Sequence, residues 1–344
     1  MKINHIYCFC YFGKSEATVR YRATYALEWL QKNKNISHDI FYPSYQIQNI
    51  IRFFWLFCCI YFFRKKNSII IFQKIFSDKI YARVLFCLLK KQKQHTLYDL
   101  DDAEHTRRDA KTIVRFMQHC QACAVGSHAL MDYVQPHNQQ IIFLTSPIIA
   151  HTQQKKFRNI QFNIGWIGYY GAHKNSLHQL VFPALLQLRF PVKITLLGVQ
   201  TAVEKAEINH YFLTNDLIEL EIPLDLDWLQ EMDIYQRISC FDLGLSPLLD
   251  NEFNRAKSAF KLKQCLSCAV PVLASPVGEN LHFLQEGVNG FFCAEASDFL
   301  AKINFFYQLN LIDYQQFSQA AAASYSLYSM ELYATNLLRF YEKY

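Results

Sequence analysis

The feature that most constrains this chain is a regular alternation of short apolar strands with amphipathic helices. In the first half, strand patterns cover residues 3–11, 39–42, 69–72, 96–98, 122–125 and 141–144. Helical patterns cover residues 19–32, 79–89 and 109–119. Strands that alternate with helices in this way form a doubly wound parallel sheet with right-handed crossovers. The sequence therefore predicts an α/β fold.

The same rhythm restarts after Thr145, which predicts a second sheet of the same kind. Strand patterns cover residues 163–167, 193–197, 241–245, 270–274 and 291–293, with helices between them, the first at 176–188. The polar segment 145–156 contains Pro147 and marks the boundary. We expect an N-terminal domain at 1–150, a second at 157–327, and a last helix at 328–344 that packs back on the first. A length of 344 residues with 51% hydrophobic residues suits two cores.

Charge and cysteine content narrow the function classes. The net charge of +6 comes from scattered basic residues, so nucleic acid is not expected as a partner, while anionic substrates or acidic lipids fit. Eleven cysteines and a strand-like N-terminus without an export signal indicate a reducing cytosol. We expect two Cys-x-x-Cys pairs, Cys120 with Cys123 and Cys265 with Cys268, to pack in the cores rather than to bind zinc.

Residues 50–63 form the most apolar segment, IIRFFWLFCCIYFF, and Arg64-Lys65-Lys66 follow it. As a helix these residues would span about 21 Å, which is shorter than a ~30 Å hydrocarbon core, so a transmembrane span is not expected. Two interpretations stay open. The segment is either a buried helix of the first domain, or it dips into a membrane interface beside its cations.

The region 241–290 carries the most informative chemistry. Lys257, Lys261 and Gln264 follow one another at spacings of four and three, which would align them on one face of a helix that starts early. A helix N-terminus flanked by lysines suits a diphosphate. The alternative is a solvated basic helix start.

Two motifs in the second half resemble the donor-binding core of the glycosyltransferase family 4 group. The first is Val270-Pro271-Val272-Leu273-Ala274-Ser275 with Gly278, followed by Glu286-Gly287-Val288-Asn289-Gly290. Ala256 and Gln264 stand where that family usually has two Glu residues. The second motif is IGWIGYYGAHKN at 164–175, in which Lys174 matches a phosphate-binding Lys and Tyr169 takes the place of an Arg.

The resemblance implies the GT-B fold, in which two Rossmann-like domains face each other across a cleft, and it implies the following site residues. The donor would contact Gly168, Lys174, Arg255, Lys257, Phe260, Lys261, Gln264, Gly278 and Glu279. The acceptor side would use Ser15, Arg20 and Arg22 of FGKSEATVRYR. Catalytic candidates are Asp101 and Asp102 of YDLDDAEH together with Lys174 and Lys261, and His105 and His128 are secondary candidates.

The implied reaction is transfer of a sugar from a nucleoside diphosphate sugar to a hydroxyl, with retention of configuration. The resemblance implies no metal, so Asp99-Leu100-Asp101 is not interpreted as a metal-binding Asp-x-Asp. We expect a glycan or lipid-linked acceptor of a bacterial envelope, and a cytoplasmic protein with peripheral contact at the inner membrane face as one interpretation. The rival functions are a sugar-nucleotide epimerase or hydrolase, and a non-catalytic partner subunit.

Overall fold

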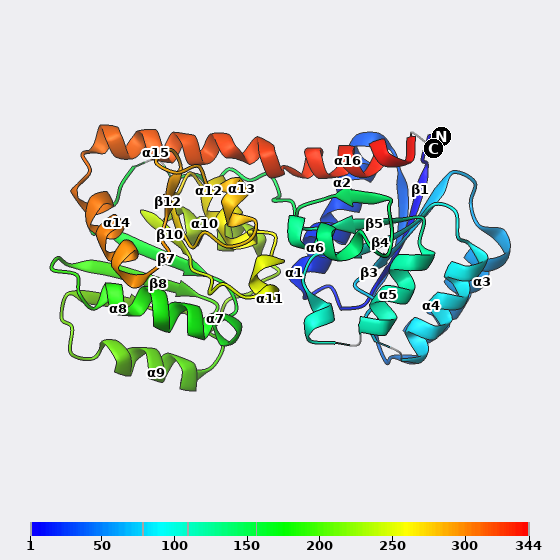
Figure 1. Ribbon diagram of the computed structural model, residues 1–344, viewed down its shortest axis with the longest axis horizontal. Coiled ribbons are helices and arrows are strands. Elements are labelled where there is room, and N and C mark those ends of the chain that lie inside the picture. Colours follow the sequence, from blue (N-terminus) through cyan, green and yellow to red (C-terminus); the bar gives the residue numbers. More distant parts are fainter. Residues whose placement is uncertain (1, 78, 109, 156, 343–344) are drawn as a thin grey trace. The chain divides into compact units, whose positions relative to one another are not determined.

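The computed structural model describes residues 2–77, 79–108, 110–155 and 157–342. The chain forms two compact units (Figure 1). The first comprises Met1–Ile149, Arg255–Ser258 and Tyr328–Tyr344, and the second comprises Ala150–Asn254 and Ala259–Leu327. Parts of three predictions lie outside the described residues: the helix start at Asp109, the boundary end at Lys156, and the last two residues of the terminal helix.

The first unit contains a six-stranded parallel sheet in the order β2-β1-β3-β4-β5-β6. Its strands are β1 (His5–Cys10), β2 (Ser37–Phe41), β3 (Ser68–Gln73), β4 (Thr96–Leu100), β5 (Ala122–Val125) and β6 (Ile141–Phe143). Its helices are α1 (Ala17–Val19), η1 (Arg20–Thr24), α2 (Tyr25–Lys34), α3 (Ile47–Phe63), α4 (Ile80–Lys91), η2 (Glu104–Thr106), α5 (Ala110–His119), α6 (His128–Val134) and α16 (Met330–Glu342). The predicted strands therefore fall in one sheet.

Burial on both faces explains why these strands read as continuous apolar runs. Every residue of β1 and β3 is buried, and β1 pairs in parallel with β2 on one side and β3 on the other. Central parallel strands lie between helix layers and need apolar side chains on both faces. The terminal helix α16 packs against α2 and joins this core, and the Tyr333 hydroxyl donates to the Arg22 carbonyl oxygen over 3.2 Å.

The second unit contains another six-stranded parallel sheet, in the order β12-β11-β10-β7-β8-β9. Its strands are β7 (Asn163–Ile167), β8 (Val192–Leu197), β9 (Ile218–Glu221), β10 (Leu243–Ser246), β11 (Val272–Ala274) and β12 (Gly290–Phe292). Its helices are α7 (Tyr170–Ser176), η3 (Leu177–Val181), α8 (Phe182–Leu185), α9 (Ala202–Phe212), α10 (Glu231–Ser239), α11 (Glu252–Arg255), α12 (Phe260–Ser267), α13 (Asn280–Phe283), α14 (Ala296–Gln308), α15 (Leu311–Ala323) and η4 (Ser324–Tyr328). The doubly wound α/β prediction is confirmed in both units.

The strand orders fix where ligands can bind. The order in which successive strands are added to the sheet reverses between β1 and β3 in the first unit and between β7 and β10 in the second. Open parallel sheets bind ligands outside the carboxyl ends of the strands at such switch points. The loops after β1, β3, β7 and β10 are therefore the places to look for chemistry.

Helix α3 settles part of the question about residues 50–63. Phe53, Leu56 and Ile60 form a buried stripe, whereas Trp55 and Phe63 are 65% and 82% exposed. The helix thus packs on the first unit with one face and leaves an apolar face uncovered. Among the described residues, no helix has the length and apolarity that a membrane crossing requires.

All eleven cysteines are free thiols. Cys120, Cys123, Cys265 and Cys268 are buried, and burial raises the pKa of each of these thiols. Their place is in the cores, as the sequence analysis expected.

Candidate active site

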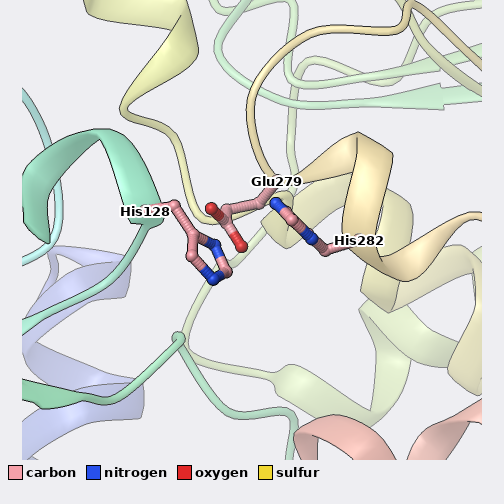
Figure 2. A group of neighbouring side chains, drawn as sticks. All are labelled: His128, Glu279 and His282. Atoms are coloured by element: carbon pink, nitrogen blue, oxygen red, sulfur yellow. The ribbon is translucent and has the colours of Figure 1, made fainter. Parts of the chain in front are cut away.

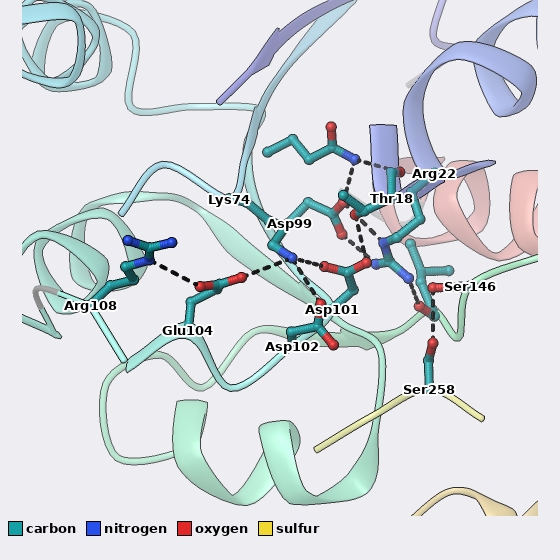
Figure 3. Close-up of polar contacts among 12 residues, drawn as sticks. Thr18, Arg22, Lys74, Asp99, Asp101, Asp102, Glu104, Arg108, Ser146 and Ser258 are labelled. Carbon is teal, nitrogen blue, oxygen red and sulfur yellow. Dashed lines mark hydrogen bonds and ion pairs between the residues drawn. The ribbon is translucent and has the colours of Figure 1, made fainter. Parts of the chain in front are cut away.

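A cluster of ionised side chains lies at the carboxyl edge of the first sheet (Figure 3). Lys74 follows β3 directly and adopts a left-handed backbone conformation with φ 52°. Its ammonium lies 3.1 Å from Asp101, 2.9 Å from Asp102 and 3.2 Å from Glu104, all in or just after the loop that follows β4. The candidate catalytic acids are thus brought together around one buried cation.

The electrostatics of the cluster keep Lys74 charged. Burial by itself lowers the pKa of Lys74, but Asp101, Asp102 and Glu104 outweigh it and hold the pKa well above its usual 10.5. Thr18 Oγ1 also donates to Asp101 Oδ2 over 2.6 Å, so Asp101 is held by two elements of the unit. Lys74 and Thr18 were missed by the sequence analysis, although a lysine directly after a strand pattern was the available signal.

Arg22 requires a correction. Its side chain is fully buried, where it forms a two-pronged ion pair with Asp99 and donates to the Leu144 carbonyl (Figure 3). The prediction that Arg22 serves the acceptor side is wrong, because its guanidinium is already paired in the core, where an unpaired one would be far less stable. Asp99 in turn accepts a bond from Gln73, which explains the role of the first acid of Asp99-Leu100-Asp101.

The other acceptor-side candidates lie near the start of α1. Ser15 is exposed, and its carbonyl oxygen accepts a hydrogen bond from the Arg20 guanidinium. Arg20 is only 3% exposed and belongs to η1, a π-helical turn between α1 and α2. π-Helical turns occur frequently at functional sites. The acceptor role of Ser15 and Arg20 stays a prediction.

Lys257 also requires a correction. Helix α12 begins at Phe260 after Ala259 in a left-handed conformation, so Lys257 lies outside the helix and does not share a face with Lys261. Lys257 belongs to the first unit, where burial lowers its pKa, the charge of Asp102 raises it, and that of Lys74 lowers it. Next to it, the Ser258 hydroxyl donates to Ser146 over 3.1 Å.

In the second unit, a turn after β7 approaches the end of β8 very closely. Gly168 has φ +151°, and its amide donates to the Leu197 carbonyl over 2.9 Å. A Cβ at Gly168 would overlap the Lys261 side chain, and a Cβ at Gly198 would overlap the Gly168 carbonyl. Glycine at both positions therefore lets backbone and a lysine meet at the switch point between β7 and β10.

Lys261 and His173 form the cationic part of this edge. The Lys261 Nζ atom lies 2.7 Å from Nε2 of His173, which α7 places just after the glycine turn. Lys261 is predicted from the sequence, whereas His173 is not. His173 lies within the matched motif 164–175, so its place beside a phosphate-binding loop could have been inferred from the sequence.

Lys174, the predicted phosphate-binding lysine, is paired with α9 instead. Its amine pairs with Glu207 of α9 at 2.7 Å, with both side chains partly exposed. Tyr169, which stands in place of the usual Arg, is 54% exposed. A phosphate ligand would have to draw Lys174 away from Glu207, and an exposed pair of this kind is worth only about 0–1 kcal/mol.

The remaining donor candidates surround α12 and α13. Gln264 is buried within α12, and Phe260 is its half-buried first residue. Arg255 is the exposed last residue of α11 and is assigned to the first unit, so it does not belong to this group. Gly278 has φ 57° and leads into Glu279, which precedes α13 as its N-cap and is 1% exposed. Figure 2 shows the side chains of Glu279 and His282, the first from the N-cap of α13 and the second from within this short helix.

Asn280, the first residue of α13, ties two strand ends together. Its side-chain amide donates to the carbonyls of Ser246 and Ser275 at 3.3 and 3.0 Å, so it joins the loops after β10 and β11. These loops are therefore fixed by buried hydrogen bonds, which suits a preorganised site.

The two secondary histidines have structural contacts in the first unit. His105 stacks on Tyr133 with ring centroids 3.6 Å apart. His128 begins α6 and packs against Phe143. Their catalytic role stays a prediction.

Comparison with known proteins supports the architecture. No family model and no curated protein matches the sequence. Solved structures match along nearly the whole chain. HepE of Anabaena, in complex with UDP and glucose, is 14% identical with a TM-score of 0.68 and covers 99% of this chain and 100% of its own. Sucrose-phosphate synthase of Thermosynechococcus elongatus is 10% identical with a TM-score of 0.73, covering 99% and 98%.

The lipopolysaccharide outer core galactosyltransferase WaaB, in its apo form, is 11% identical with a TM-score of 0.67 and covers 98% of this chain and 99% of its own. At these identities the matches show the fold. The protein is thus a two-domain α/β protein of the GT-B class, built from two Rossmann-like parallel sheets.

Proposed function

We propose that this chain is a glycosyltransferase that moves a sugar from a nucleoside diphosphate sugar to a hydroxyl acceptor. The carrying observation is the glycine turn after β7, which meets Lys261 and His173 at the switch point of the second sheet. Cations at such a switch point suit a diphosphate. Three structures of the similar HepE protein, whose fold covers the whole chain, are complexes with UDP, with UDP and glucose, or with UDP-glucose.

The proposed chemistry needs few protein groups. Lys261, with His173 beside it, would stabilise the negative charge that develops on the leaving diphosphate, and Lys174 would join after release from Glu207. The diphosphate would help to deprotonate the acceptor on the same face of the sugar, so configuration is retained. The lysines supply the positive charge, and the proposal therefore requires no metal.

The acid cluster of the first unit would serve the acceptor. Asp101 and Asp102 are the candidates for contact with the acceptor hydroxyl, and Lys74 would act as a positioning residue that holds both carboxylates in place through its ion pairs. Their place at the carboxyl edge of the first sheet supports this assignment.

We further propose a role in envelope glycan synthesis on the cytoplasmic face of a membrane. The fold shared with WaaB, the free thiols and the uncovered apolar face of α3 support it. Liposome flotation tests the membrane part. Replacing exposed Phe54 and Trp55 with Ser should abolish flotation on anionic vesicles, whereas the matched pair Val203→Ser and Leu213→Ser in the second unit should not. Equal flotation of all three proteins would remove this part.

A thermal-shift screen against nucleoside diphosphates and their sugars tests the central proposal. A ligand at 100 times its Kd stabilises the folded protein by about 2.7 kcal/mol. Stabilisation by a nucleotide sugar followed by acceptor-dependent turnover is expected. Product release without acceptor would instead indicate an epimerase or hydrolase, and binding with no turnover on any acceptor would indicate a partner subunit.

A further inference from the structure

A large apolar cavity lies within the first unit, apart from the acid cluster. Its volume is about 810 Å³, and it is bounded by the loop after β1, the loop after β2 and the facing sides of α3 and α4. Phe41 and Phe53 form buried parts of its lining, while Phe54, Ile80 and Val84 line it from the two helices. This volume falls in the range of ligand-binding pockets, about 300–1,000 Å³.

The lining is apolar, yet much of it is exposed. Tyr45 is 93% exposed, Ile80 76%, Phe54 49% and Ile50 42%. A contiguous apolar surface of this kind marks a site for a membrane or an apolar ligand. In the described part of the chain, these four side chains remain uncovered.

The charge around the cavity defines the kind of ligand. Lys79 and Arg83 line the cavity at the start of α4, and both are exposed. Across residues 47–93 the sequence has ten lysines and arginines and one acid, Asp78. An apolar slot with cations beside it complements a hydrocarbon chain that carries an anionic head group.

The cavity also adjoins the proposed acceptor edge. Tyr11, Phe12 and Gly13 line it, and the same loop continues to Ser15 and Thr18. The Tyr81 hydroxyl donates to the Cys10 carbonyl over 3.0 Å, which fixes α4 to the end of β1.

We propose that this cavity binds the hydrocarbon chain of a lipid phosphate whose head group carries the acceptor hydroxyl, with the phosphate at Lys79 and Arg83. This inference rests on the proposed glycosyl transfer and names the acceptor class for it. The hydrocarbon chain would occupy the space between α3 and α4. The head group would extend along the loop after β1 toward Thr18, which donates a hydrogen bond to Asp101.

Calorimetry of the full chain with monomeric alkyl phosphates, from butyl to dodecyl phosphate, tests the cavity without any nucleotide. Affinity should rise about fourfold for each added methylene until the cavity is full, and then level off. Alkyl trimethylammonium ions of the same length should bind at least about tenfold more weakly, which corresponds to 1.4 kcal/mol.

Variants separate the two halves of the site. Val84→Trp fills the cavity and should remove the dependence of affinity on chain length. If this variant does not fold, Ile80→Ser takes its place and should weaken that dependence. Lys79→Glu with Arg83→Glu should remove the preference for phosphate. Lys90→Glu with Lys93→Glu makes the same charge change on exposed residues that do not line the cavity, and should leave both properties intact.

Affinity independent of chain length, or full binding by Val84→Trp, would overturn the proposal. Thermal shift with UDP on the same samples separates this failure from failure of the proposed function. A protein that binds UDP but not alkyl phosphates refutes the cavity alone. A protein that binds alkyl phosphates but no nucleoside diphosphate refutes the acceptor role.

Discussion

Replacing Lys74 with Met is the sharpest test of the acid cluster. The substitution keeps the length of the side chain but removes a charge that lies 2.9–3.2 Å from three carboxylates. At an effective dielectric constant of about 20, each contact is worth roughly 5 kcal/mol before desolvation is counted. Breaking a buried ion pair costs about 3–5 kcal/mol in net terms, because the partner charges remain uncompensated. We expect a loss of that size in the free energy of unfolding.

The pH dependence of the loss has a definite sign. The folded-state pKa of Lys74 lies above its usual 10.5, so the stability it contributes is complete below 10.5 and is lost only as the pH rises through the folded value. At neutral pH the whole effect should therefore be visible.

Urea unfolding, followed by circular dichroism and by tryptophan fluorescence, measures the effect. The matched control is Lys93→Met, an exposed residue for which a change within about 0.5 kcal/mol is expected. Adding Asp102→Asn to the Lys74 variant should recover part of the loss, with a coupling of about 0.5–3 kcal/mol. If Lys74→Met unfolds at the same urea concentration as Lys93→Met, the cluster does not hold the loop after β4.

Three further predictions concern the second unit. Gly168→Ala should cost about 1–3 kcal/mol of stability and reduce the thermal shift given by nucleoside diphosphates, because the φ of +151° at this position disfavours a Cβ. The control is Gly13→Ala, whose Cβ would meet only Ser15 Oγ at 3.9 Å. Lys261→Ala should lower turnover about 10²–10³-fold in a steady-state assay. The control is Lys193→Ala, because Lys193 pairs with Glu221 near the amino end of β8, and it should leave turnover unchanged. Equal turnover of the two variants would exclude Lys261 from leaving-group stabilisation. Burial lowers the pKa of His151 below 6.5, so its contribution to stability is present above pH 6.5 and lost as the pH falls; His151→Phe should therefore show a smaller drop in urea midpoint between about pH 7 and 5 than the parent.

Much of the architecture could be predicted because its signals are local. Apolar runs such as residues 69–72 identify buried parallel strands, and Gly168 after a strand marks a turn. The site was less predictable. Lys257 and Lys261 have helical spacing, but the left-handed Ala259 ends the helical path between them. Only the backbone conformation separates the two lysines.

The sequence by itself determined two doubly wound sheets and therefore placed the chemistry in the loops after their strands. Tertiary structure decided which charged side chains in those loops are already paired. Arg22 pairs with Asp99, 77 residues away, and Lys174 pairs with Glu207, 33 residues away. Lys74, which the sequence did not distinguish, collects three acids from about 28 residues further on. The reason is physical: strand and helix patterns depend on neighbours in the sequence, whereas ion pairs depend on which loops the fold brings within a few ångströms.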